Sequence, residues 1–185
     1  MSNDELAFAL ERSFLAYEFL TWLWFRCEVE GGNFDLDGVG SVGVAVDDGL
    51  SLARLQDDEL KASLRGGNPT GRPEAANALA AGLLLKKARL VVAKGSREWS
   101  FGLDAETLDL SGVKVVDPQA EEEEPEDALA DKLSSAEELR EIVDGLFREF
   151  LALRLDDEWE ALEVGRLRDW VRTKLERAWQ VVGTA

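Results

Sequence analysis

Basic side chains that could bind phosphate gather in one stretch of the sequence. Residues 60–97 hold eight lysines and arginines against a single acid, Glu74, and so carry a net charge of +7. Because the whole chain of 185 residues carries −17, the rest must carry −24, the difference between these two charges. Lysine and arginine neutralise phosphate oxygens, and arginine can hold two of them at once. The candidate DNA-binding residues are therefore Arg65, Arg72, Lys86, Lys87, Arg89, Lys94 and Arg97.

A loop and a hairpin hold most of these cations. The string RGGNPTGR, residues 65–72, combines glycines, which let a backbone come close to an anion, with an arginine at each end. It is not a P-loop, because it lacks the Gly-Lys-Ser/Thr ending. In the strand that follows, alternate residues share one face, so Lys87 and Arg89 would stand together, with Lys94 and Arg97 at the hairpin tip. These cations would then form one basic surface.

Two other interpretations of the basic segment stay open. RGGNPTGR is also compatible with a plain surface loop. The cations would equally serve to neutralise the protein's own acids, including residues 117–131, which hold eight acids and two prolines without a base. The charge count alone does not separate a DNA-binding surface from internal charge compensation.

The chain offers no residue set for catalysis. It contains no histidine, so a Ser-His triad and a zinc site are excluded. Its single cysteine, Cys27, is expected to be buried and inert. Carboxylates are numerous, but they follow no pattern that indicates a glycosidase or a metal-dependent nuclease. We therefore expect a non-enzymatic protein with no catalytic residues, no metal and no cofactor.

The string EFLTWLWF, residues 18–25, has two interpretations. Trp22 and Trp24 would stack on bases in a protein that binds single strands. Such platforms usually lie on exposed strands with cations between the rings, whereas these rings lie among leucines on a helix. Apolar residues nearly surround this helix end, so it must be enclosed on several sides. A core position is therefore the favoured interpretation.

The remaining patterns predict an α+β fold. Apolar residues three and four apart predict a first helix from Asn3 or Asp4 to about Arg26. Alternating stretches then predict an antiparallel sheet of five or six strands, with a hairpin turn at residues 47–49. One intervening helix should open at Pro73 and end near residues 82–85. The first helix should pack on this sheet.

The last third of the sequence predicts a linker and a helical tail. Residues 117–131 have the composition of a solvated acidic linker. Ser135 and Glu138 fit a capping box at the start of a C-terminal helical hairpin. The predicted organisation is an α+β domain over residues 1–116, the linker over 117–131, and a helical tail over 132–185 that packs on the same domain.

Four strings together carry a resemblance to a known family: YEFLTWLWFRCE, LRGGNPTGRPEA, KKARLVVAKGSREWSFGLDAETLDLSGVK and FLALRL. They resemble the C-terminal region of RdgC-type recombination-associated proteins, in the short stand-alone bacterial form, over most of residues 14–116. The resemblance implies a non-enzymatic protein that binds double-stranded DNA without sequence preference, dimerises around the duplex and restrains RecA-driven strand exchange. It maps no DNA contact onto this chain, so the candidate residues rest on the charge count.

The composition indicates where in the cell the protein is located and what it can bind. No stretch approaches the roughly 18 to 20 apolar residues that span a bilayer, and the first residues are acidic where a signal peptide is basic. We therefore expect a cytoplasmic, nucleoid-associated protein that does not engage membranes. Its expected partner is double-stranded DNA, together with a second copy in a homodimer or another protein. The alternative is an acidic protein–protein interaction module, or a DNA mimic, that binds a basic partner.

Overall fold

The computed structural model describes residues 12–54, 57–117, 125–157 and 159–182, with the side chains of 12–16, 57–60, 125–128 and 181–182 left out. It confirms the predicted α+β fold. The predicted helix start at Asn3 or Asp4 lies outside the described residues. The elements are α2 (Arg12–Val29), β1 (Asn33–Leu36), β2 (Gly40–Arg54), β3 (Asp57–Arg65), η1 (Pro69–Gly71), α3 (Pro73–Ala80), β4 (Leu84–Lys94), β5 (Arg97–Asp104), β6 (Leu110–Val116), α4 (Pro125–Arg154), η2 (Trp159–Glu163) and α5 (Val164–Val182).

The strands form one antiparallel sheet in the order β1-β2-β4-β5-β6, and β3 also pairs with β2. The hairpin turn predicted at residues 47–49 is wrong, because β2 runs through these residues as one strand. Val46 pairs with Leu90 of β4 and Leu50 pairs with Ala88, so three residues of β2 lie opposite one residue of β4. This is a bulge, which bends a strand without ending it.

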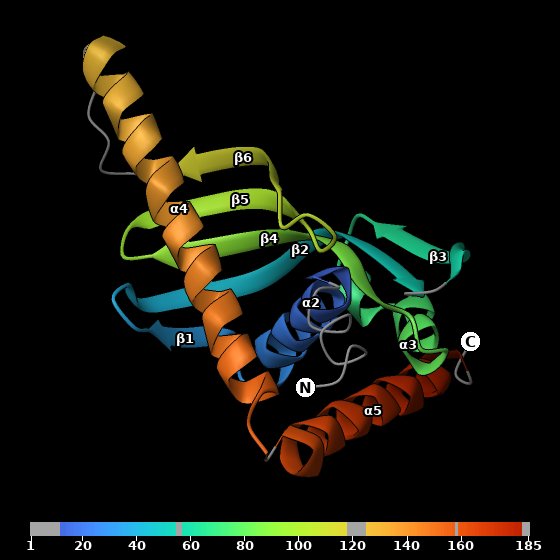
Figure 1. Ribbon diagram of the computed structural model, residues 1–185. Coiled ribbons are helices and arrows are strands. Elements are labelled where there is room, and N and C mark those ends of the chain that lie inside the picture. The colour runs from blue at the N-terminus through green and yellow to red at the C-terminus, as the bar shows by residue number, and fades with distance from the viewer. Residues whose placement is uncertain (1–11, 55–56, 118–124, 158, 183–185) are drawn as a thin grey trace.

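One face of the sheet carries the helices. Figure 1 shows α2 lying against the sheet and α4 crossing the sheet on the same side. The rings of EFLTWLWF are inside: Phe19, Trp22 and Trp24 have no exposed surface. Trp22 lies 5.6 Å from the ring of Phe150 in α4, and Trp24 lies 5.1 Å from Trp170 in α5. The core interpretation of this string is confirmed, since its rings contact both C-terminal helices.

The intervening helix α3 begins at Pro73 as predicted. It ends at Ala80, before the predicted range of 82–85. Gly82 has a φ of +81°, and the amide of Leu83 donates to the carbonyl of Ala78. A glycine in this left-handed conformation commonly terminates a helix. The following leucines therefore begin strand β4.

Helix α4 begins earlier than the sequence predicted. It starts at Pro125, so residues 125–131 of the predicted linker are helical; residues 118–124 lie outside the described part of the chain. The prediction of a capping box at Ser135 is therefore wrong, because Ser135 lies in the interior of the helix. Ser135 is buried inside α4, and its hydroxyl accepts a hydrogen bond of 2.9 Å from Trp99 Nε1.

Helix α5 follows α4 after a short break and lies against α2 and α3 (Figure 1). Together, α4 and α5 are the C-terminal helix pair that the sequence predicted. Among the described residues, no helix is both long enough and apolar enough to cross a membrane.

Candidate functional site

Three of the seven candidate cations meet on the sheet face opposite α2. In β4, the side chains of Ala88, Leu90 and Val92 are buried toward α2, so Lys87 and Arg89 project from the other face. With Arg65 from the end of β3, they line a hollow of about 460 Å³. This is the part of the predicted basic surface that the fold brings together.

Acids oppose two of these three cations. Lys87 forms an ion pair with Asp104 of β5. Arg89 lies opposite the bulge in β2, and its Nε is 3.5 Å from Asp47 Oδ2 and 3.9 Å from Asp48 Oδ1. The backbone of Arg65 pairs with Gly49 of β2, but its side chain makes no ion pair or hydrogen bond with the described residues. The hollow therefore has three cations and three acids around it, and its local charge is close to neutral.

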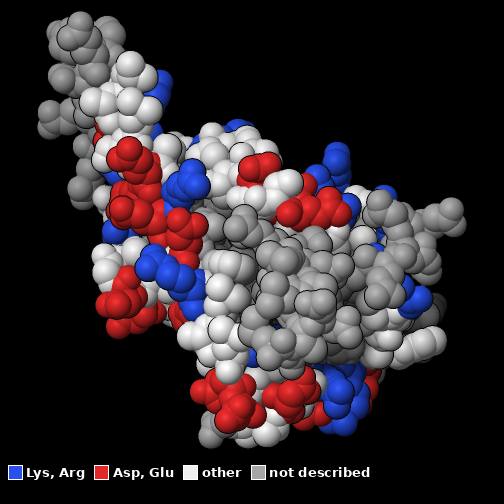
Figure 2. Space-filling model, in the orientation of Figure 1, with Lys and Arg blue, Asp and Glu red and all other residues white. Residues whose placement is uncertain are grey.

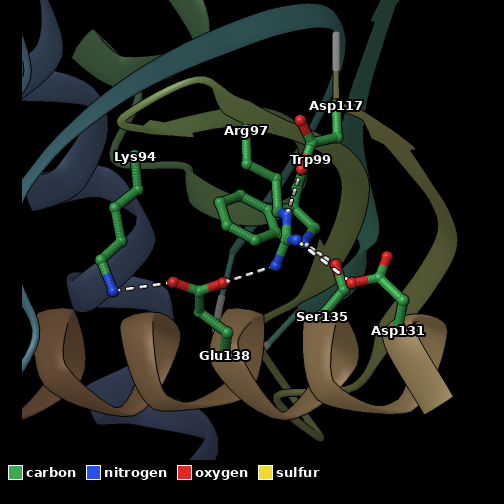
Figure 3. Close-up of polar contacts among 7 residues, drawn as sticks. All are labelled: Lys94, Arg97, Trp99, Asp117, Asp131, Ser135 and Glu138. Atoms are coloured by element: carbon green, nitrogen blue, oxygen red, sulfur yellow. Dashed lines mark hydrogen bonds and ion pairs between the residues drawn. The ribbon is translucent and has the colours of Figure 1, made fainter. Parts of the chain in front are cut away.

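A second pair of candidates is held by α4, as Figure 3 shows. Lys94 Nζ lies 2.7 Å from Glu138 Oε1. Arg97 contacts three carboxylates: its Nη1 is 3.0 Å from Glu138, its Nε is 3.1 Å from Asp117, and its Nη2 is 3.3 Å from Asp131. The tip of the β4–β5 hairpin is thus bound to α4 and to the start of the predicted acidic linker.

The pKa of Glu138 reflects these contacts. Burial disfavours its charged form, but the hydrogen bonds and positive charges of Lys94 and Arg97 outweigh burial and lower the pKa below its ordinary value. The hydrogen bond to Asp117 is the main reason that the pKa of Arg97 is raised. Both groups are therefore firmly charged near neutral pH.

Lys86 lies away from the other candidates, near Tyr17 of α2. Its Nζ donates a hydrogen bond of 2.6 Å to Glu106 Oε1, to which the Tyr17 hydroxyl also donates, at 2.7 Å. The hydrogen bonds from Lys86 and Tyr17 lower the pKa of Glu106. Burial, followed by the bond to Glu106, raises the pKa of Tyr17 to about 12. This cation supports the packing of α2 against the sheet.

Arg72 lies at the far end of RGGNPTGR. Its Nη2 donates to the backbone carbonyl of Gly66 at 2.7 Å, which closes the loop on itself. Asn68 sits between them with a φ of +42°, and the hydroxyl of Thr70 donates to Asn68 Oδ1 at 2.8 Å. Arg72 lines a different hollow from the one that holds Arg65.

The seven candidates therefore lie in four separate places, and carboxylates of the same chain pair with most of them. Lys86, Lys87, Arg89, Lys94 and Arg97 each pair with an acid of the same chain. Two of those acids, Asp117 and Asp131, come from the predicted linker. Sequence reasoning found the cations but could not choose their partners among 38 acids, because every pair joins distant parts of the chain.

A group of acids with few such partners lies on α4, on β1 and just after β1. Glu137, Glu141 and Asp144 are exposed at helical spacing along α4, and Figure 2 shows acids gathered over this helix. Next to them, a hollow of about 330 Å³ is lined by Asp35, Asp37 and Glu149, with Arg148 as its cation. We call these acids the α4 acidic surface; they are Asp35, Asp37, Glu137, Glu141, Asp144 and Glu149.

Most carboxylates of the α4 acidic surface lack the ion pairs that the cations on the sheet have. Apart from Glu149, which lies 3.8 Å from Arg26, its carboxylates form no ion pair with the described residues. Burial, together with the nearby charge of Glu30, raises the pKa of Glu149 although Arg26 opposes this. A cation placed in the adjoining hollow would relieve that repulsion. Sequence reasoning missed this surface, and its only signal was the spacing of the three acids in α4.

The structure bears on metal binding and on the reactivity of Cys27. Within the described residues, no three histidine, cysteine or acidic side chains are grouped to hold a metal ion. The sequence predicts that Cys27 is buried, but it is only half-buried; its thiol donates to the carbonyl of Val44 at 3.2 Å, and loss of solvent around the thiol raises its pKa to about 12. A thiol with this pKa is almost wholly protonated at neutral pH and is a poor nucleophile.

No family model, no curated protein and no solved structure matches this chain. The resemblance to RdgC-type proteins therefore stays a prediction.

Proposed function

We propose that the protein is a non-enzymatic interaction module that binds a basic partner protein through the α4 acidic surface. The observation that supports this is the distribution of ion pairs. Five of the seven candidate DNA-binding cations pair with the protein's own acids, whereas five of the six acids in the α4 acidic surface have no cation partner among the described residues. The charge that is not paired within the protein is therefore mainly negative on the α4 acidic surface, where a basic partner would bind.

The physical consequence is electrostatic steering. A surface rich in one sign of charge attracts a partner of the opposite sign, and this raises the association rate in a manner that salt suppresses. The hollow beside Glu149 adds a place where a lysine or arginine side chain could be partly enclosed. Its floor is tightly packed, since a Cβ added at Gly145 would lie 3.2 Å from Leu36.

A lysine-rich peptide tests the proposal. We expect labelled deca-lysine to bind the intact chain, as measured by fluorescence anisotropy, and to bind more weakly when salt rises from about 50 to about 200 mM. Neutralising the surface with Glu141→Gln/Asp144→Asn should weaken binding at least about threefold, because charges near a bound cation contribute most.

The control changes net charge by the same amount elsewhere. Glu160 and Glu176 are exposed on η2 and α5, outside the α4 acidic surface, and Glu160→Gln/Glu176→Gln also removes two negative charges. It should weaken binding less than the α4 variant does. Equal weakening by the two variants would mean that only net charge attracts the peptide, and the proposed surface would be wrong.

A second candidate function is association with double-stranded DNA, as the RdgC-type resemblance implies. It is favoured by the hollow that Arg65, Lys87 and Arg89 share, where the side chain of Arg65 has no partner among the described residues and the side chain of Lys87 is 57% exposed. Phosphates would have to displace Asp104 and Asp47 from these cations. Three phosphate contacts predict a slope of about −3 for log K against log salt.

A random-sequence duplex, titrated at about 50 and 200 mM salt, tests this second candidate. If DNA binds here, Lys87→Glu/Arg89→Glu should abolish binding, and raising the salt should weaken it about 40-fold. An intact chain that does not bind the duplex even at the lower salt would exclude the DNA function. That result would leave the deca-lysine test unaffected.

A further inference from the structure

A hollow with more cations than acids lies at the junction of α5, the RGGNPTGR loop and the start of α3. Its volume is about 410 Å³. Lys174 and Arg177 of α5 line one side, Asn68, Thr70 and Arg72 line another, and Glu28 of α2 is its only acid among the described residues. The hollow shares no lining residue with the hollow on the sheet or with the one beside Glu149.

Contacts within the protein already use every oxygen of Glu28. Its Oε1 accepts hydrogen bonds from Trp24 Nε1 at 2.7 Å and Lys174 Nζ at 2.8 Å. Its Oε2 accepts from Trp170 Nε1 at 2.9 Å and Lys174 Nζ at 2.7 Å. Lys174 also donates to the carbonyl of Thr70 at 2.7 Å. Glu28 and Lys174 therefore neutralise each other, and Glu28 has little capacity for another cation.

The two arginines of the hollow are left without a carboxylate among the described residues. The side chain of Arg72 donates there to the carbonyl of Gly66 and makes no ion pair, and the side chain of Arg177 makes no hydrogen bond or ion pair with the described residues. This contrasts with the sheet, where acids hold five of the candidate cations. Burial lowers the pKa of Lys174, and the positive charge of Arg177 adds to this effect against the opposing influence of Glu28. An anion in the hollow would relieve this repulsion.

We propose that this hollow binds the phosphate group of a small phosphorylated molecule, with Arg72 and Arg177 as its charged ligands. Guanidinium groups match phosphate oxygens with paired hydrogen bonds, and two of them balance the charge of a phosphomonoester dianion. The hollow is larger than a phosphate group alone. The remainder of the molecule would lie against its apolar wall, which is formed by Pro73, Ala76 and Ala178. This site is independent of the proposed basic partner.

Calorimetry with ribose 5-phosphate, ribose and inorganic phosphate tests the site on the intact chain. We expect both phosphates to bind and ribose not to bind, because the arginines recognise the phosphate. Arg72→Gln/Arg177→Gln should weaken the binding of ribose 5-phosphate at least about tenfold, since hydrogen bonds between charged groups are stronger than those between neutral groups. Arg168→Gln, on the same helix but outside the hollow, should leave binding unchanged.

Three outcomes would overturn the proposal. The first is no binding of either phosphate at ligand concentrations of about 10 mM, which corresponds to negligible affinity. The second is equal weakening by the Arg168 control, which would mean a general charge effect. The third is a random-sequence duplex that binds the intact chain, binds the Arg72→Gln/Arg177→Gln variant more weakly and is displaced by inorganic phosphate. The phosphate group recognised by the two arginines would then belong to nucleic acid. Melting temperatures of the variants would show that each one is folded.

Discussion

Thr21 is a hydroxyl inside an aromatic helix, and it ties that helix to the sheet. Its Oγ1 donates to the carbonyl of Tyr17 and accepts from the backbone amide of Leu85 in β4, each at 2.9 Å. Valine has nearly the same shape but cannot accept this bond, so Thr21→Val would leave a buried amide unpaired. We expect the free energy of unfolding to fall by about 1–3 kcal/mol, as measured by chemical denaturation.

A second threonine provides the control at the residue scale. Thr173 is exposed on α5, and its hydroxyl donates only to the carbonyl of Asp169. Thr173→Val should change the free energy of unfolding by less than about 0.5 kcal/mol. If Thr21→Val and Thr173→Val had the same free energy of unfolding, the hydrogen bond between Thr21 and Leu85 would make no net contribution to stability, and the prediction would be wrong.

At the scale of elements, the attachment of α4 to the β4–β5 hairpin should depend on pH. The pKa of Glu138 is lowered in the folded protein, so its contribution is complete above the unfolded value of about 4.3 and is lost as pH falls through the folded value. Glu138→Gln should lower the free energy of unfolding by about 0.5–1 kcal/mol at pH 7, because the pair is partly exposed. The difference in stability between the variant and the parent should shrink as the pH falls below the unfolded pKa, and it should disappear once the pH is below the folded pKa of Glu138.

The adjacent residue supplies the matched control for α4. Glu137 is exposed and has no ion pair among the described residues, so Glu137→Gln should change the free energy of unfolding at pH 7 by less than about 0.5 kcal/mol. A Glu138 variant whose stability differs from that of the parent by the same amount at pH 3 and pH 7 would contradict the proposed role of the ion pairs.

The same elements show what the sequence could predict. The aromatic helix, the alternating strands and the start of α3 at Pro73 follow from local patterns, and the structure has them. The early start of α4 did not follow, because its acids indicated a solvated segment. One of them, Asp131, binds Arg97 of β5, which is a contact between distant residues. The pairing of Arg89 with Asp47 likewise depends on a bulge that no local pattern revealed.

At the scale of the whole molecule, the tryptophans report whether the helical tail and the sheet unfold together. Of the six, five are at most 7% exposed and belong to one core that includes residues of the sheet, α2, α4, η2 and α5, whereas Trp179 is 69% exposed. Because Trp24 contacts Trp170 of α5 and Trp22 contacts Phe150 of α4, losing the tail would expose the centre of the core. We therefore expect tryptophan fluorescence and far-ultraviolet circular dichroism to give coincident denaturation curves.

Acrylamide should quench mainly Trp179, so Trp179→Phe should remove most of the quenching while Trp170→Phe should not. An early transition in which the helical signal falls before the fluorescence changes would mean that the tail is a separate folding unit.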